Sequence, residues 1–400
     1  MPALTASGLS IYCLAEGEET MLQGIYIYDA DAHVMMSPRM WQDLPETIWP
    51  RRPRPVQIED PEGLGGWQSS WFVEGRLTPH LWGSGSQPAN TPATTNPTFP
   101  GTDASLPIEI GSRDLSRPEL RLKDLDRMGI DTTVLYPSTL YATMTDDPEL
   151  EAHLFRAYNR YMGASCRANP KRLKWAGLLP LRHAGEGRQA VVEMKELGAS
   201  AAVVFGTAGD RLISDPFFSP IFDELTRTGL PLSIHFGMSY PPLREHSRTM
   251  FSGQFIGMTL PVFLGFYAAI GGGLLDRYPS LKIAFLEFGS EWILYAVPRM
   301  ELFRKMARRR GAPWPSDMPQ KEILDYVRSG RLFITCEGED ALLPQEIELV
   351  GEDHLLFASD MPHPELRDNA AKEILERRDL SPGQKRKILC DNATRFYGAA

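Results

Sequence analysis

The sequence contains few cysteines, and none of them are paired in a motif. Cys13, Cys166, Cys336 and Cys390 lie far apart in the 400 residues, without a CxxC spacing. This excludes a disulfide-stapled secreted scaffold and a cysteine-based zinc site. We therefore expect four free thiols in a reducing compartment.

Positive charge is also in short supply. Lys and Arg number 42 against 51 Asp and Glu, which gives a net charge of -9. A nucleic-acid-binding protein needs basic residues spread along one face to neutralise phosphates. The basic run at 304–310, RKMARRR, instead suits the end of a helix, where the helix dipole favours cations. The composition therefore argues against nucleic acid as a partner.

The sequence has no long uninterrupted hydrophobic run. The longest apolar stretch, 254–275, is broken by Pro261 and by the glycines 271–273, which predicts a buried helix rather than a membrane span. The first 20 residues lack the basic start and apolar core of a secretory signal. We expect a soluble, cytoplasmic protein without a membrane partner.

The chain does contain a regular alternation of strand-like and helix-like segments. Amphipathic stretches such as 119–129, ELRLKDLDRMG, separate short runs that are apolar on both faces. Such runs indicate a parallel sheet with helices on both faces. The predicted strands are 25–31, 130–136, 173–179, 199–205, 230–236, 281–288, 331–337 and 354–360.

Eight such units favour a closed (β/α)8 TIM-like barrel. An open dinucleotide-binding sheet would need a glycine-rich loop after an early strand, whereas the GGG at 271–273 follows a predicted helix. We expect an N-terminal extension at 1–24 and a barrel at 25–400. An insertion at about 37–116 after the first strand is predicted to be a lid, with Trp67, Trp71 and Phe72 as apolar anchors.

Acidic and histidine side chains follow the predicted strands of this barrel. Each one alone fits a helix cap or a solvated residue. Because the carboxyl ends of barrel strands meet at one mouth, together they predict a metal site. In strand order they are Asp31 and His33 on the first, His235 on the fifth, Glu287 on the sixth, Glu337 on the seventh with Glu339 beyond it, and Asp360 on the eighth with His363 beyond it.

These motifs resemble a known family. The patterns are D-x-H at 31–33, H-x-G at 235–237, L-K-I-x-F-x-E at 281–287 and F-A-S-D-x-P-H at 357–363. They are similar to the amidohydrolase-related metal-dependent barrels, nearest to the branch of the aminocarboxymuconate-semialdehyde and resorcylate-type decarboxylases. The resemblance covers about 29–397 and implies one divalent metal, bound here by Asp31, His33, His235 and Asp360.

Three departures from that pattern point towards oxygen ligands. Asp31 replaces the commoner histidine, Glu287 stands where relatives usually carry a histidine, and the predicted strand 199–205 has no Lys or Glu to bridge two metals. A carboxylate-rich set suits a pair of iron or manganese ions. With Glu337 on the seventh strand, the chain is similar to non-haem diiron monooxygenases built on the amidohydrolase scaffold.

Our leading interpretation is therefore a diiron monooxygenase. Two iron ions activate dioxygen to hydroxylate a small, mostly apolar substrate under the lid. Glu287, His363 and Asp360 are the expected catalytic residues. The expected metal ligands are Asp31, His33, His235, Glu287, Glu337 and Asp360.

Two other readings compete with it. One is a hydrolase or non-oxidative decarboxylase of an aromatic or unsaturated carboxylic acid, with a single ion such as Zn or Mn and Glu287 or His363 as general acid or base. The other is a barrel that only binds ligands. Arg244 and His246 could meet a substrate carboxylate, although an exposed loop charge is the reading we favour. A homodimer is a further expectation.

Overall fold

The computed structural model describes residues 22, 24–57, 69–78, 80, 108–140, 144–315, 318–363 and 369–399. The predicted extension 1–24 lies almost wholly outside these residues, and so do Trp67 and much of the predicted lid. The core of the fold falls within them.

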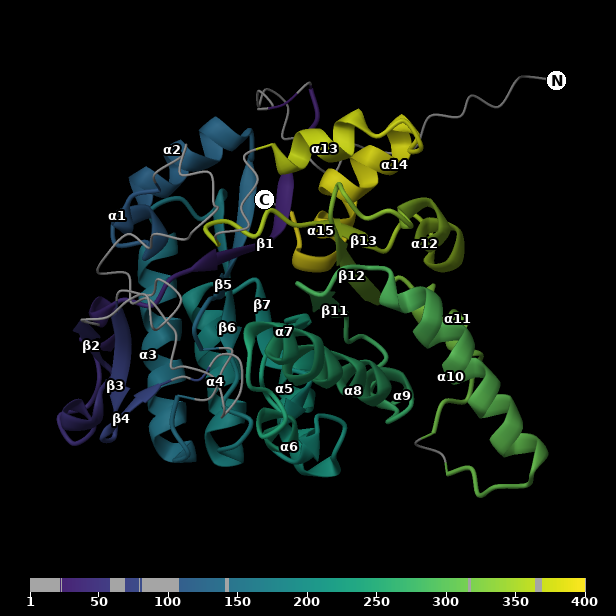
Figure 1. The fold of residues 1–400 in the computed structure, drawn as a ribbon, viewed down its shortest axis with the longest axis horizontal. Coiled ribbons are helices and arrows are strands. Elements are labelled where there is room, and N and C mark those ends of the chain that lie inside the picture. Colours follow the sequence, from purple (N-terminus) through teal and green to yellow (C-terminus); the bar gives the residue numbers. More distant parts are fainter. Residues whose placement is uncertain are drawn as a thin grey trace.

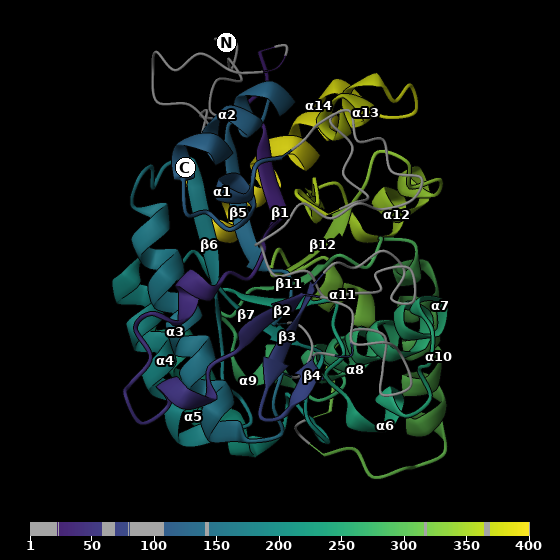
Figure 2. The ribbon, with the colours of Figure 1, turned by 60° about the vertical axis from the view of Figure 1, so that its left-hand side comes forward.

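The described core is the predicted (β/α)8 barrel. Eight parallel strands follow one another in the order β1-β5-β6-β7-β10-β11-β12-β13, and the Asp360 amide closes the ring by donating to the Asp31 carbonyl at 3.0 Å. Helices surround these strands (Figures 1 and 2). The strands are β1 Tyr28–Val34, β5 Thr132–Pro137, β6 Leu173–Leu178, β7 Ala201–Phe205, β10 Leu232–His235, β11 Ile283–Leu286, β12 Leu332–Cys336 and β13 Leu355–Phe357.

The first strand begins and ends three residues later than predicted. It pairs with β5 through His33 opposite Tyr136 and Val34 opposite Pro137, and all seven of its residues are buried. The pairing with β5 therefore carries the strand through Asp31 and His33. Both side chains stand inside the barrel mouth rather than in a loop beyond it.

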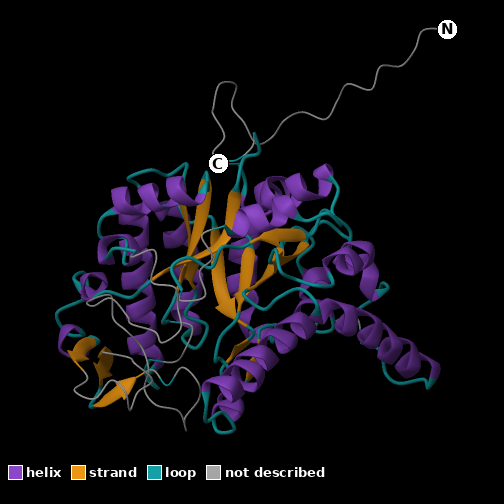
Figure 3. Cartoon of the chain, turned by 45° about the horizontal axis from the view of Figure 1, so that its top comes forward, coloured by secondary structure: helices purple, strands orange, loops and turns teal. Residues whose placement is uncertain are grey.

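The predicted amphipathic stretches form helices outside the strands, and Figure 3 shows them on both sides of the barrel. Gly129 and Gly198 end α2 and α4 with φ of 71° and 89°, a left-handed conformation that favours glycine. The helices are α1 Ile110–Arg113, α2 Pro118–Met128, α3 Pro148–Cys166, α4 Ala184–Leu197, α5 Ser219–Thr228, α6 Pro241–Arg244, α7 Met250–Ser252, α8 Thr259–Ile270, α9 Leu274–Arg277, α10 Trp292–Arg309, α11 Ile323–Val327, α12 Leu343–Val350, α13 Ala370–Glu376, α14 Pro382–Arg386 and α15 Asn392–Tyr397. Short 3-10 or π turns are η1 Pro38–Trp41, η2 Trp49–Arg51, η4 Pro216–Phe218, η5 Gly253–Met258 and η6 Lys387–Asp391.

The apolar stretch Met250–Arg277 is the one helical segment of the described chain that is long and apolar enough to cross a membrane, by length and composition. Within the fold, 67% of its apolar window is buried, and α8 packs against β7 and β10. The approach is so close that a Cβ at Gly206 would lie 1.6 Å from the carbonyl oxygen of Pro261. Packing against the barrel therefore accounts for the apolar composition of this stretch.

The described part of the insertion forms a small antiparallel sheet, β2 Arg54–Gln57, β3 Ser69–Val73 and β4 Arg76–Thr78. It is tied to the segment after β5 by ion pairs of 2.6 Å, Arg51 with Asp147 and Arg76 with Asp146. These bonds anchor the insertion beside the carboxyl end of β5. A lid function remains a prediction.

The cysteines differ in part from the expectation of four free thiols. Cys166 and Cys336 are free and buried, and burial raises the pKa of both thiols, so they are packing groups rather than reactive ones. Cys390 is instead disulfide-bonded, and Cys13 lies outside the described residues. Sequence spacing alone does not report such a pairing.

Candidate metal centre

Five of the predicted ligands converge at the mouth of the barrel. The Nε2 atom of His33 lies 3.0 Å from Glu287 Oε2, 3.1 Å from Asp360 Oδ1 and 3.6 Å from Asp31 Oδ1. The Nε2 atom of His235 lies 3.0 Å from the same Glu287 oxygen and 3.5 Å from Asp31 Oδ1. The facing ligand atoms form two overlapping groups, one from Asp31, His33, His235 and Glu287 and the other from His33, Glu287, Asp360 and His363.

The backbone aims these side chains inwards. Asp31 and His33 alternate with buried apolar residues along β1, and His235 is the last residue of β10. Glu287 and Asp360, just beyond β11 and β13, have φ of 55° and 58°. Such left-handed backbone is uncommon in residues other than glycine and is concentrated at functional sites.

The facing atoms of this cluster lack hydrogen-bond partners among the residues that the structure describes. A buried polar atom without a partner is costly, so five together require another explanation. Ligands at about 2.1 Å from a shared ion are about 3.0–3.5 Å apart, which fits the observed 3.0–3.6 Å. The atoms are Asp31 Oδ1, His33 Nε2, His235 Nε2, Glu287 Oε2 and Asp360 Oδ1, and they offer ligands for a divalent ion.

The electrostatics of the cluster also favour a cation. Burial lowers the pKa of His235, but the carboxylates of Asp31 and Glu287 outweigh burial and raise that pKa to about 10. Burial also lowers the pKa of His33, but Glu287 and Asp360 outweigh burial and raise that pKa well above its usual value. The two imidazoles in turn hold the pKa of Glu287 well below its usual range, against the effect of burial. A metal ion would compete with these protons for the same nitrogen atoms.

Residues behind the ligands hold them in place, and sequence reasoning missed the main one. Asp29 is fully buried and accepts hydrogen bonds from the Ser359 amide at 3.0 Å, the Ser359 hydroxyl at 2.7 Å and the Thr133 hydroxyl at 2.9 Å. Burial raises the pKa of Asp29 to about 7. It thereby links the strand of Asp31 to the residue before Asp360. An acidic residue inside an apolar strand is the signal that could have found it.

Arg121 is a second supporting residue that the sequence did not single out. It is fully buried on α2, and its Nη2 donates to the carbonyl oxygens of His33 at 2.9 Å and Ser112 at 2.8 Å. Burial lowers the pKa of this guanidinium to about 10. Arg121 therefore fixes the backbone of a metal-ligand candidate from outside the barrel.

His363 lies at the edge of the cluster. Its Nδ1 is 2.7 Å from Asp360 Oδ1, its Nε2 is 3.1 Å from the Ser138 hydroxyl, and its ring stacks on His33 at 4.0 Å between centroids. Its side chain is 14% exposed, so it faces both the ligands and the mouth. This placement suits proton transfer better than structural packing.

Two sequence expectations differ from the structure here. Glu337 is half-buried and belongs to neither of the two overlapping groups of ligand atoms. The strand β12 ends at Cys336, and the Glu337 amide beyond it donates to Asp340 Oδ2 at 2.8 Å. Arg244, favoured as an exposed loop charge, is half-buried on α6, while His246 is exposed.

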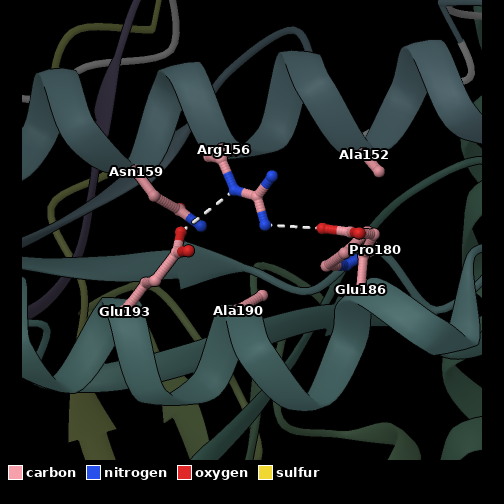
Figure 4. A pocket seen from close by; sticks show the side chains of 7 residues that line it. All are labelled: Ala152, Arg156, Asn159, Pro180, Glu186, Ala190 and Glu193. Atoms are coloured by element: carbon pink, nitrogen blue, oxygen red, sulfur yellow. Dashed lines mark hydrogen bonds and ion pairs between the residues drawn. The ribbon is translucent and has the colours of Figure 1, made fainter.

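A small hollow between α3 and α4 lies outside the barrel mouth (Figure 4). Arg156 fills it by binding Glu186 at 2.5 Å and Glu193 at 3.0 Å. Asn159 points from α3 towards β6 and donates to the Leu178 carbonyl at 3.1 Å. These contacts join helices to the barrel, so the hollow has a structural role.

Comparison with known proteins identifies the family. The amidohydrolase family model matches residues 28–399, nearly the whole described chain. The chain belongs to the amidohydrolase family. It is 24% identical over 307 residues to a gamma-resorcylate decarboxylase of a Polaromonas species, covering 72% of this chain and 90% of the relative. It is 22% identical to the 2-amino-3-carboxymuconate-6-semialdehyde decarboxylase of Dictyostelium discoideum, covering 70% and 76% of the two chains.

A solved structure shows the same fold over almost the full length of this amidohydrolase. The 5-carboxyvanillate decarboxylase of Novosphingobium aromaticivorans, complexed with manganese and a nitrobenzoic acid, superimposes with a TM-score of 0.68. The match covers 95% of this chain and 99% of that one, at 17% identity. The similarity supports the barrel prediction independently of the sequence motifs.

These findings overturn the diiron monooxygenase interpretation. The curated relatives and this structural neighbour are decarboxylases, not oxygenases. The geometry agrees with this correction in one respect, because Glu337, one of the six expected ligands, is in neither group of facing ligand atoms. Glu287, the extra carboxylate on the sixth strand, belongs to both groups.

Proposed function

We propose that this amidohydrolase is a metal-dependent decarboxylase of an aromatic or unsaturated carboxylic acid. The observation that carries the proposal is the convergence of imidazole and carboxylate ligand atoms at the barrel mouth, where those of Asp31, His33, His235 and Glu287 lie within 4.8 Å of one another. The decarboxylases among its relatives support the choice of reaction. Manganese, present in a structural neighbour, is the favoured ion, with zinc as an alternative.

In this proposal Asp31, His33, His235 and Asp360 hold the ion, and Glu287 is the fifth ligand. A divalent ion bound there would polarise the carboxylate and an adjacent oxygen of the substrate. The His235 Nδ1–H donates to the Phe236 carbonyl at 2.9 Å, which leaves Nε2 free to bind.

His363 is the proposed proton donor. Its ring is oriented by Asp360 on one nitrogen and by Ser138 on the other. The proton is added to the substrate carbon that bears the carboxylate. The bond between that carbon and the carboxylate then breaks, its electron pair returns to the unsaturated system, and carbon dioxide leaves.

Metal content and gas release test the proposed function. We expect one manganese per chain after purification with that ion. Carbon dioxide should be released anaerobically from 2,6-dihydroxybenzoate, or from a related hydroxylated aromatic acid. A strict requirement for dioxygen, or no release from any acid of this class by metal-loaded protein, would contradict the proposal.

Two substitutions distinguish the proposed metal ligand, Glu287, from the proposed proton donor, His363. Glu287→Gln should lower manganese affinity at least about tenfold, because a ligand is lost. His363→Asn should retain the ion but lower kcat by about 10²–10⁴-fold, the usual contribution of general acid catalysis. Glu339→Gln, at an exposed position, is the matched control and should change neither quantity. Loss of the ion in His363→Asn would instead make this histidine a ligand.

We also propose the remaining organisation of the molecule. Residues 1–24 form an extension, residues 25–400 the barrel, and the insertion at about 37–116 a lid that excludes water. The composition supports a soluble, cytoplasmic enzyme. Exposed aromatic side chains, among them Phe251, Phe255, Tyr295 and Phe303, support a homodimer.

A further inference from the structure

A cavity of about 60 Å³ lies at the carboxyl ends of β6 and β7. Its wall is mostly apolar and comes from five separate segments of the chain. The side chains used below are Leu140, Phe155, Leu181, Ala208 and Met238.

The cavity adjoins the reacting position through shared residues. Phe205 lines it and also meets the ring of His235 edge-on, at 6.4 Å between centroids. Leu140 follows Ser138, the hydrogen-bond partner of His363, by two residues. Met238 lies three residues after His235, in the loop that follows β10. A ligand bound to the ion therefore has this cavity as its neighbour.

The charged groups of the cavity bind each other. Arg182 pairs with the buried Glu151 through two nitrogens, at 2.9 Å and 2.6 Å, and its Nη2 also donates to the Thr145 carbonyl at 2.8 Å. The hydroxyls of Thr207 and Ser239 lie 3.0 Å apart and form a hydrogen bond. These groups are satisfied within the protein, so the wall favours an apolar occupant over a charged one.

The insertion reinforces this side of the mouth. The Thr145 hydroxyl donates to Glu74 at 2.5 Å, and Arg51 pairs with both Glu74 and Asp147. A continuous series of hydrogen bonds and ion pairs thus runs from Arg182 at the cavity through Thr145 to Glu74 in the insertion. These contacts connect the wall of the cavity to the insertion.

We propose that this cavity binds a short apolar substituent on the substrate, on the part of the molecule away from the carboxylate that is lost. The inference rests on the proposed decarboxylase function and specifies its substrate class. A cavity of about 150 Å³ accommodates benzene, so a space of about 60 Å³ suits a chain of a few carbon atoms rather than a second ring.

Binding of reaction products by manganese-loaded enzyme tests this inference. The probes are resorcinol, 5-propylresorcinol and 3,5-dihydroxybenzoate, measured by calorimetry. At about 0.8 kcal/mol for each buried carbon, 5-propylresorcinol should bind at least about tenfold more tightly than resorcinol. The charged 3,5-dihydroxybenzoate should gain nothing. Equal affinities for the two resorcinols, or tighter binding of the charged probe, would overturn the inference.

Substitutions in the cavity wall test whether the preference for the propyl substituent arises in this cavity. Ala208→Phe fills it and should reduce the affinity ratio of the two resorcinols to below about two, whereas the exposed Ala312→Phe should keep the wild-type ratio. Met238→Ala enlarges the cavity and should move the preferred chain from propyl to pentyl. If the ratio persists in Ala208→Phe and the preferred chain length is unchanged in Met238→Ala, the substituent binds elsewhere.

Carbon dioxide release from 2,6-dihydroxybenzoate and its 4-propyl derivative distinguishes the two proposals. Release without a propyl preference leaves the decarboxylase function intact and rejects the cavity inference. Release from neither acid, by metal-loaded enzyme, rejects the proposed function and the inference that depends on it.

Discussion

Asp29 shows how a side chain that does not face the ion can decide where the ligands stand. It joins β1 to the segment just after β13, because the amide and the hydroxyl of Ser359, 330 positions away, both donate to it. Asp29 also accepts a hydrogen bond from the backbone N–H of Asp31, at 3.3 Å from Asp29 Oδ1. Two metal-ligand candidates therefore share one buried support.

Asp29→Asn should weaken manganese binding by about 10–100-fold, the usual effect of losing a partner behind a ligand. Asparagine carries no charge, and its amide nitrogen would require the hydroxyls of Ser359 and Thr133 to turn from donors to acceptors. Titration with manganese measures the change. Asp223→Asn, exposed on α5, is the control, and unchanged affinity in Asp29→Asn would show that Asp29 does not position the ligands.

At the scale of elements, the barrel depends on close contact between strands and covering helices. Gly206, at the end of β7, lies against the backbone of α8 at Pro261. No side chain fits between the two, so the position of α8 depends on this glycine. Further round the barrel, α12 contributes a buried carboxyl group, that of Glu346, to a cluster with Ser290 and Asp340, which follow β11 and β12.

Gly206→Ala should destabilise the fold by about 3 kcal/mol or more, because the new Cβ meets a backbone carbonyl that cannot rotate away. Chemical denaturation measures the free energy of unfolding. Gly185→Ala on α4 is the matched control, since its nearest atom would be at an ordinary 3.8 Å. The control should be neutral or slightly stabilising, and equal effects of the two substitutions would contradict the packing argument.

Glu346 on α12 should make stability depend on pH. Burial raises the pKa of Glu346 from 4.5 to about 7, although a hydrogen bond from Ser290 opposes the shift. The Ser290 hydroxyl also faces Asp340 at 2.9 Å and can donate to only one of the two carboxylates. The protonated form of Glu346 is therefore favoured in the fold. Its contribution to stability is full below about pH 4.5 and is lost as the pH rises through about 7.

Glu346→Gln should therefore stabilise the fold relative to wild type more at pH 8 than at pH 5. The difference between the two pH values in the variant's gain in free energy of unfolding should be about 1–3 kcal/mol. Denaturant titrations at the two pH values provide the measurement. Glu348→Gln, exposed on the same helix, should show no such difference. Parallel behaviour of the two variants would indicate that Glu346 is ionised in the fold.

At the scale of the whole molecule, the ion should stabilise the barrel, since its ligands come from β1, β10 and the ends of β11 and β13. Binding at 100 times the dissociation constant adds about 2.7 kcal/mol. For a chain of 400 residues this corresponds to a rise in Tm of about 3 °C. Removal of the ion by a chelator should lower the Tm by that amount.

Thermal unfolding with and without manganese measures this effect. Asp31→Asn should lose most of the response, because it removes a buried charged ligand. An equal response in Asp31→Asn and wild type would place the stabilising ion elsewhere. Exposed acidic residues such as Asp223 offer a control for non-specific binding.

Local patterns in the sequence determined the barrel, its strand order along the chain and most of the metal-centre candidates. Apolar runs that alternate with amphipathic helices admit few folds, and the carboxyl ends of barrel strands meet at one mouth. Asp31, His33, His235, Glu287 and Asp360 therefore follow from these patterns alone. The relatives, rather than these patterns, overturned the monooxygenase interpretation.

Only the tertiary structure separated Glu287 from Glu337, although both follow a barrel strand. The direction of a side chain depends on the residue at which its strand stops and on the backbone angles there. Glu287 turns inwards with a φ of 55°, whereas the backbone of Glu337 turns to bind Asp340. Asp29 and Arg121 likewise gain their roles from partners distant in sequence, which no local pattern records.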